Sequence, residues 1–219
     1  RLINNAGVMN LPLAYTEDHL ETVFGTNHVG HFAFTGRVLP ALLAAPGSRI
    51  VTTSSISHRF GRIRWDDLAG AGGYSRSRAY AQSKLANLLF AFELQRRLHM
   101  AGAGTISLAA HPGQVATSIG QSRDGAGRLQ SAIIEPLGRR IAERGAKPLV
   151  QRPSEGALPM LRAATDPGAY GGQYYGPAGP AGMTGPPVVV PPARRALDVE
   201  HQMRLWQITE ELTGIEFAV

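Results

Sequence analysis

One long helix is predicted from Tyr80 to about Met100, because apolar residues recur there at helical spacing and Gly102 follows as a stop. Its first turns read Ala79-Tyr80-Ala81-Gln82-Ser83-Lys84, so Tyr80 and Lys84 lie one turn apart on the same face. An ammonium beside a phenol favours the phenolate and lowers the tyrosine pKa from about 10, toward the pH at which it can exchange protons with an alcohol or a carbonyl. The pair indicates acid–base chemistry. The alternative is an aromatic anchor followed by a solvated lysine.

The composition favours the chemical interpretation. Lys84 and Lys147 are the only lysines among the 22 Lys and Arg residues, so arginine is the default cation of this chain. A compact ammonium and a planar guanidinium are not interchangeable, and a lysine one turn after a tyrosine is therefore less expected by chance.

Four other short motifs surround this helix. Each ends an apolar or β-branched run or lies in an apolar helical stripe, and they are Asn4-Asn5-Ala6-Gly7, Asn27-His28-Val29-Gly30-His31-Phe32, Ser54-Ser55 and His111-Pro112-Gly113. With Tyr80 and Lys84 they resemble the short-chain dehydrogenase/reductase family over Leu2 to Thr117, and more weakly beyond. The long step from Ser55 to Tyr80, which contains Arg62-Ile63-Arg64-Trp65-Asp66-Asp67-Leu68, is similar to the retinol dehydrogenase-like branch.

The resemblance implies a doubly wound α/β domain of the Rossmann type with a parallel sheet, N-terminally truncated and entered at its fourth strand. Family members begin with a strand and a Gly-rich turn into a helix, where backbone amides hold the cofactor pyrophosphate. Neither Gly70-Ala71-Gly72-Gly73 nor the Gly/Pro run after Gly168 follows a suitable strand. We therefore expect residues 1–219 to be a single, partial domain that binds no dinucleotide by itself.

By the same resemblance, the catalytic residues are Asn27, Ser55, Tyr80 and Lys84. Tyr80 would act as general acid in reduction and as general base in oxidation, while Lys84 lowers its pKa and holds the nicotinamide ribose hydroxyls. Ser55 would hydrogen-bond the substrate oxygen. Asn27 is either a clamp on backbone groups or the holder of a water that relays protons to Lys84.

The implied cofactor is NADP or NAD, with the branch favouring NADP, and the implied substrate is a small carbonyl or alcohol compound, lipophilic in this branch. The implied cofactor contacts are Asn5, Ala6, Gly7, Tyr80, Lys84, Pro112, Gly113, Val115 and Thr117. The first three would line the adenosine-ribose side, and the last four would form a turn that closes over the nicotinamide carboxamide and phosphates. A non-catalytic binding or scaffold module, or an inactive fragment of such an enzyme, is the alternative.

The remaining elements follow from periodicity and turn residues. We expect a helix capped by Thr16 that continues to about Leu42, strands at 48–55 and 105–110, a substrate lid at 114–150, a helix capped by Ser154, a last strand at 172–175, a proline-stiffened surface loop to Pro192, and a final helix at 196–213.

Other classes of function are less favoured. The net charge of +6 comes from scattered arginines, so we expect no nucleic-acid partner. Without cysteine there is no thiolate nucleophile or metal ligand, and His28 and His31 have no convergent carboxylate nearby, so no metal site is expected. No apolar run approaches the roughly 18 residues of a membrane span, and we expect a cytoplasmic protein. A homo-oligomer is left open.

Overall fold

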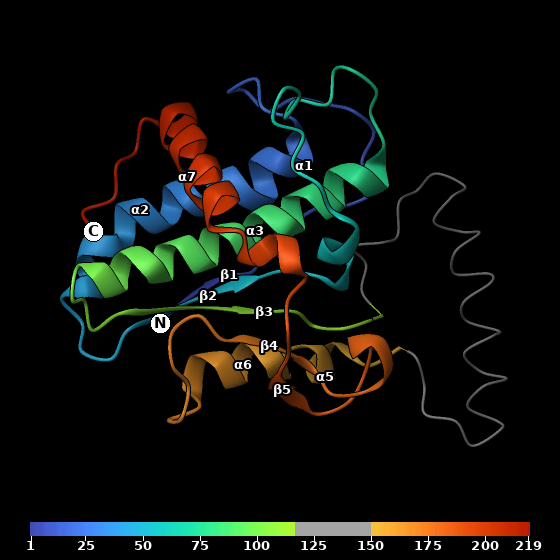
Figure 1. Cartoon of the computed structure of the whole chain (residues 1–219). Coiled ribbons are helices and arrows are strands. Elements are labelled where there is room, and N and C mark those ends of the chain that lie inside the picture. Colours follow the sequence, from blue (N-terminus) through green and yellow to red (C-terminus); the bar gives the residue numbers. More distant parts are fainter. Residues whose placement is uncertain (117–149) are drawn as a thin grey trace, which may run out of the picture.

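The computed structural model describes residues 1–116 and 150–219, which form a sheet between two helical layers (Figure 1). The strands lie in the order β1-β2-β3-β4-β5, the first four parallel and the last antiparallel to its neighbour. Their bounds are β1 Leu2–Asn4, β2 Arg49–Thr53, β3 Ile106–Ala110, β4 Tyr174–Pro177 and β5 Pro187–Val189. The predicted doubly wound α/β class with a parallel sheet is confirmed.

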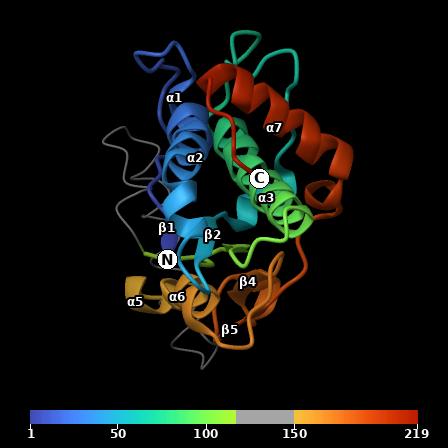
Figure 2. The same cartoon turned by 90° about the vertical axis from the view of Figure 1, so that its left-hand side faces the viewer.

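The central strands are buried on both faces. Ile50 and Val51 of β2 and Leu108 and Ala109 of β3 are fully buried, as expected for parallel strands covered by helices on both sides. Helices α2, α3 and α7 cover one face and α5 and α6 the other (Figure 2). Because the first four strands run in parallel, the turns that follow them meet at one edge of the sheet.

The helix before β2 begins later than predicted. It consists of α1 (Thr22–Phe24), a π-helical turn (Gly25–Val29) and α2 (Gly30–Leu43). Thr16 is not its cap. Glu21 caps it instead, because its two carboxylate oxygens accept from the amides of Val23 and Phe24, both at 2.8 Å.

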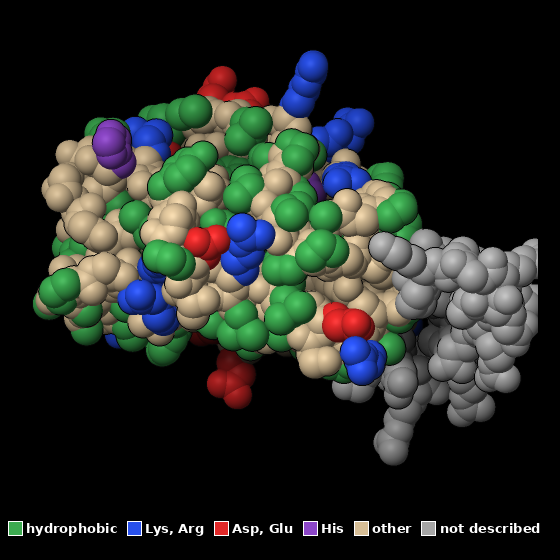
Figure 3. All heavy atoms as spheres, turned by 90° about the horizontal axis from the view of Figure 1, so that it is seen from below, with side chains coloured by type: hydrophobic (Ala, Val, Ile, Leu, Met, Phe, Trp, Pro, Cys, Tyr) green, Lys and Arg blue, Asp and Glu red, His purple; other side chains and the backbone are tan. Residues whose placement is uncertain are grey.

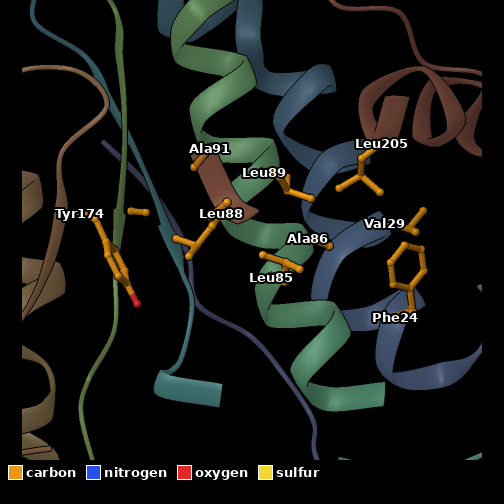
Figure 4. Close-up of a cluster of buried hydrophobic side chains, with 11 residues drawn as sticks. Phe24, Val29, Leu85, Ala86, Leu88, Leu89, Ala91, Tyr174 and Leu205 are labelled. Atoms are coloured by element: carbon orange, nitrogen blue, oxygen red, sulfur yellow. The ribbon is translucent and has the colours of Figure 1, made fainter. Parts of the chain in front are cut away.

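Helix α3 (Arg76–Met100) is the predicted long helix and starts one turn before Tyr80. Figure 4 shows its apolar side chains between two layers: Leu88 lies toward Tyr174 on the sheet, and Leu89 lies toward Leu205 of α7. The helix is therefore a central element rather than a surface one.

The C-terminal part corrects several predictions. The helix predicted from Ser154 is α5 (Pro153–Gly156) followed by α6 (Leu158–Thr165), and Arg152 rather than Ser154 stands at its start. Strand β4 is not the last strand, since β5 lies inside the stretch predicted to be a loop and pairs with β4 through Val188 and Val189. Short 3₁₀ turns occur at Ile56–Phe60, Pro180–Gly182 and Arg194–Leu197.

The final helix α7 (Val199–Thr213) is confirmed, with Gly214 in the left-handed conformation at its end. Its Trp206 packs on Phe217 of the tail, with ring centroids 4.5 Å apart, and Phe217 packs on Phe32 of α2 at 4.6 Å. The C-terminal segment thus covers α2 and α3.

The predicted lid at 114–150 falls largely outside the described residues, and Thr117 entirely so. None of the helices in the described part combines the length and hydropathy that a membrane span needs. On the face shown in Figure 3, basic side chains are scattered among acidic and apolar ones.

Candidate active site

The turns after β1, β2 and β3 and the first half of α3 bring the predicted catalytic residues together. The Tyr80 phenol interacts with the side chain of Ser55, which lies two residues after the end of β2. The Lys84 ammonium lies 5.6 Å from the centroid of the Tyr80 ring. Residues 25 positions apart in sequence therefore meet at the carboxyl edge of the sheet, where catalytic groups of open α/β sheets gather.

Lys84 is held in a nearly closed site. Its side chain is 4 % exposed, and its Nζ donates to the carbonyl oxygen of Thr53 at 3.3 Å. Burial lowers the pKa of Lys84 to about 8, because the charged form loses its hydration. The ammonium therefore still predominates at neutral pH.

The Tyr80 pKa differs from the prediction. Burial raises the pKa of Tyr80 above its usual value of 10, and the hydrogen bond with Ser55 opposes this rise only in part. The pKa of Tyr80 is therefore not lowered overall in this arrangement, in contrast to the prediction, because burial disfavours the charged phenolate. Tyr80 is therefore a protonated phenol at neutral pH.

Asn27 is fully buried in the π-helical turn. Its Oδ1 accepts from the Val8 amide at 2.8 Å, and its Nδ2 donates to the Val8 carbonyl at 2.9 Å and to the Ser83 hydroxyl at 3.0 Å. Of the two predicted roles for the side chain, the structure supports the clamp on backbone groups. It ties the turn after β1 to α3, one residue before Lys84.

The turn after β1 passes close to these groups. A Cβ added at Gly7 would lie 3.1 Å from Asn27 Oδ1 and 3.5 Å from Lys84 Nζ, so a side chain there would enter the space in front of the ammonium. Asn5 accepts a long hydrogen bond of 3.4 Å from the Thr53 hydroxyl, and Ala6 lies between Asn5 and Gly7.

The turn after β3 is held by the C-terminal part. Gly113 has φ of 75°, and a Cβ there would overlap the carbonyl oxygen of Met183. Gln151 donates from Nε2 to the Pro112 carbonyl and forms a backbone bridge with Val115. The predicted cofactor residues Pro112, Gly113 and Val115 therefore share one braced turn.

A polar cluster behind Ser55 was missed by the sequence reasoning. It consists of His58, His111 and Tyr174, all nearly or fully buried. The Tyr174 ring packs on both imidazoles, with centroid distances of 5.5 Å to His58 and 5.2 Å to His111, and its hydroxyl lies 3.5 Å from His58 Nδ1. The sequence shows His58 three residues after Ser55, which could have indicated a role near the site. It does not show that Tyr174, 116 positions away, lies against His58.

A cavity of about 300 Å³ lies beside the start of α3, between this helix and the loop at 60–75. Apolar, basic and acidic side chains line it, among them Phe60, Arg62, Arg78 and Asp67. Tyr80 and Ser55 are not among its lining residues. In the described part of the chain, no group of three or more His, Cys, Asp or Glu side chains could hold a metal ion.

Comparison with known proteins agrees with this geometry. Residues 1–126 match the family described as short chain dehydrogenase. The chain therefore belongs to the short-chain dehydrogenase family.

Within the family, the chain lies in the retinol dehydrogenase-like branch. It is 35 % identical to retinol dehydrogenase 14 of Mus musculus over 98 % of this chain and 59 % of that protein. It is 40 % identical to polyprenol dehydrogenase of the same species over 97 % of this chain and 59 % of that protein. The chain thus spans about three fifths of the length of these relatives. An uncharacterized protein from Mycobacterium paratuberculosis, known from a crystal structure, is 39 % identical with a TM-score of 0.76, over 100 % of this chain and 68 % of that one.

Proposed function

We propose that this chain carries the catalytic residues of an NAD(P)-dependent oxidoreductase that interconverts a carbonyl compound and its alcohol. The observation that carries the proposal is the meeting of Ser55, Tyr80 and Lys84 at the carboxyl edge of the sheet. A hydroxyl, a phenol and an ammonium around one point are the groups needed to hold a carbonyl oxygen and to exchange its proton.

The roles follow from the protonation states. Tyr80, whose pKa is raised by burial, is protonated at neutral pH and donates its proton to the substrate oxygen as the carbonyl is reduced. Ser55 hydrogen-bonds the same oxygen and stabilises its developing negative charge. The Lys84 ammonium supplies a positive charge behind Tyr80 and is available to ribose hydroxyls. In oxidation, the proton returns to Tyr80.

Asn27 acts through its neighbours. By clamping Val8 and Ser83, it fixes the separation between the turn after β1 and the helix that carries Tyr80 and Lys84. We also propose that a water molecule held beside Asn27 relays protons to Lys84.

The proposed nicotinamide cofactor supplies the hydride when it is bound, and the residues present fit it. The missing side chain at Gly7 leaves room in front of Lys84, and the braced turn of Pro112, Gly113 and Val115 faces the same edge. Asn5 and Ala6 would line the ribose on the other side, and Thr117 would complete the turn. We propose NADP rather than NAD from the branch alone.

The proposed substrate class is a lipophilic alcohol or its aldehyde or ketone. Two relatives are named for retinol and for polyprenol, both alcohols with long apolar chains.

The test uses the full-length protein that contains this chain. NADPH and NADH oxidation is followed with a panel of lipophilic aldehydes and ketones, for the wild type, Tyr80→Phe and the matched control Tyr170→Phe, whose ring is 68 % exposed. We expect Tyr80→Phe to lose about 10²-fold or more in turnover, and Tyr170→Phe to lose none. Turnover of Tyr80→Phe within a few-fold of wild type would contradict the proposal. Dinucleotide binding by the wild type without any turnover would favour a non-catalytic binding module.

A further inference from the structure

His58 connects the reacting part of the site to the C-terminal part. It lies three residues after Ser55, in the 3₁₀ turn that follows β2, and is 1 % exposed. Its Nδ1 is 2.6 Å from the carbonyl oxygen of Ser55, and its Nε2 is 3.1 Å from the amide nitrogen of Ala193. Both ring nitrogens therefore contact backbone groups, in segments 135 positions apart.

These two partners determine the tautomer. The Ala193 amide can only donate, so Nε2 must be the unprotonated acceptor, and the Ser55 carbonyl can only accept, so Nδ1 carries the hydrogen. Only the neutral Nδ1–H form makes both bonds. Burial and the neighbouring Arg59 and Arg195 keep the pKa of His58 below its usual value, which favours this neutral form.

The same two segments are joined at two further points. Arg59 donates to the carbonyl of Ala181 at 3.2 Å, and Arg195 donates to the carbonyl of Gly61. His58 lies between these contacts and is the one whose bond reaches Ser55 directly. These three contacts hold the turn after β2 against residues 181–195. Through His58 they extend to Ser55, the residue proposed to hold the substrate oxygen.

The bond to the Ser55 carbonyl affects where the Ser55 hydroxyl points. The Ser55 carbonyl belongs to the peptide between Ser55 and Ile56, so the bond from His58 fixes this peptide plane and holds the Ser55 backbone in place. Ser57 competes for that hydroxyl, because its amide donates to Ser55 Oγ at 3.2 Å. A turn that is not held by His58 could shift the Ser55 backbone and carry the hydroxyl away from Tyr80, and misplacement by about 1 Å can cost on the order of 10²-fold in rate.

We propose that His58 is a positioning residue of the hydride-transfer reaction, which as a neutral Nδ1–H imidazole holds Ser55 so that its hydroxyl meets Tyr80 and the substrate oxygen. This inference rests on the proposed function. His58 does not itself exchange protons with the substrate, since its ring is buried and both nitrogens have backbone partners, with the Tyr174 hydroxyl as a longer contact of 3.5 Å to Nδ1.

Two variants of the full-length protein separate the two bonds. His58→Asn places an amide donor at the position of Nδ1 and keeps the Ser55 contact, whereas His58→Gln places an amide acceptor at the position of Nε2 and keeps the Ala193 contact. Both remove the ring, so each is the stability control of the other, and thermal unfolding is recorded for both.

We expect His58→Asn to retain kcat within about 5-fold of wild type and His58→Gln to lose at least about 10-fold, with similar melting temperatures and an unchanged Kd for the dinucleotide. Nitrogen-15 NMR of the wild-type imidazole should show a protonated Nδ1 and an unprotonated Nε2. Equal losses in both variants, no loss in His58→Gln, or a protonated Nε2 would overturn the inference. A wild type without turnover would overturn the proposed function as well, whereas an active wild type with an unimpaired His58→Gln overturns only the role of His58.

Discussion

Residues 1–116 and residues 150–219 contribute to the site in different ways. The first part carries the proposed reacting groups Ser55, Tyr80 and Lys84. The second part contributes groups that hold the turns of the first in place, through the contacts Gln151–Pro112, Tyr174–His58 and Ala193–His58. Changes in the first part should therefore abolish chemistry in a stable protein, whereas changes in the second should weaken folding and alignment together.

The largest expected effect is on the reacting side, for Lys84→Arg. The guanidinium keeps the charge, but the site around Nζ is nearly closed, with the Thr53 carbonyl at 3.3 Å and the Gly7 backbone close by. A planar fork cannot replace a compact ammonium there. We expect turnover to fall by at least about 10²-fold, measured as kcat in the full-length protein.

Lys84→Met serves as the uncharged control for this variant. If charge alone mattered, Lys84→Arg would be active and Lys84→Met inactive. That result would contradict the account, which expects both to be impaired.

The next effect is at the contact between the two parts, for Gly113→Ala, because Gly113 of the first part lies against Met183 of the second. A Cβ there meets the Met183 carbonyl at a positive φ, so strain and overlap add to about 3 kcal/mol of destabilisation. Gly47→Ala is the matched control, because its φ of 63° is similar and nothing lies within 4 Å of the added Cβ. We expect a loss of about 1 kcal/mol for the control, measured by urea unfolding. Equal losses would show that the contact with Met183 is unimportant.

The smallest expected effect is a pH dependence of stability caused by Lys84. Its pKa is about 8 in the folded protein, whereas an unperturbed lysine side chain has a pKa of 10.5, so between these values the unfolded chain binds more protons than the folded one. The contribution of Lys84 to stability therefore rises with pH above about 8, by at most about 1.4 kcal/mol per pH unit. The free energy of unfolding of wild type minus that of Lys84→Met should show this slope. Parallel curves from about pH 7.5 to about pH 9.5 would contradict the pKa of the buried ammonium.

The same division explains what could be predicted from the sequence. Strands β2 and β3 are short runs of residues suited to burial on both faces, and the Tyr80–Lys84 spacing is local, so both were accessible to sequence reasoning. Strand β5 was missed because it lies in a Gly/Pro run and gains its place only by pairing with β4. The pairing of His58 with Ala193 depends on two segments that only the complete fold brings together.

Two local predictions failed because each considered one interaction while another has the larger effect. Thr16 has the residue type of a cap, but Glu21 offers two acceptors to the helix start and Thr16 closes the preceding turn instead, accepting from the Leu20 amide. The Tyr80 pKa was predicted from the neighbouring charge alone, whereas burial in the folded site has the larger effect.

The central claim is that Ser55 and Tyr80 act as one unit on the substrate oxygen, and a double-mutant cycle tests it directly. Turnover is measured in the full-length protein for Ser55→Ala, Tyr80→Phe and the double variant, with the Kd for NADPH as a check that the site stays folded. Because residues that act as a unit have strongly non-additive effects, we expect the double variant to be no slower than about twofold below Tyr80→Phe. Losses that multiply, so that the double variant falls by the product of the two single effects, would contradict the claim.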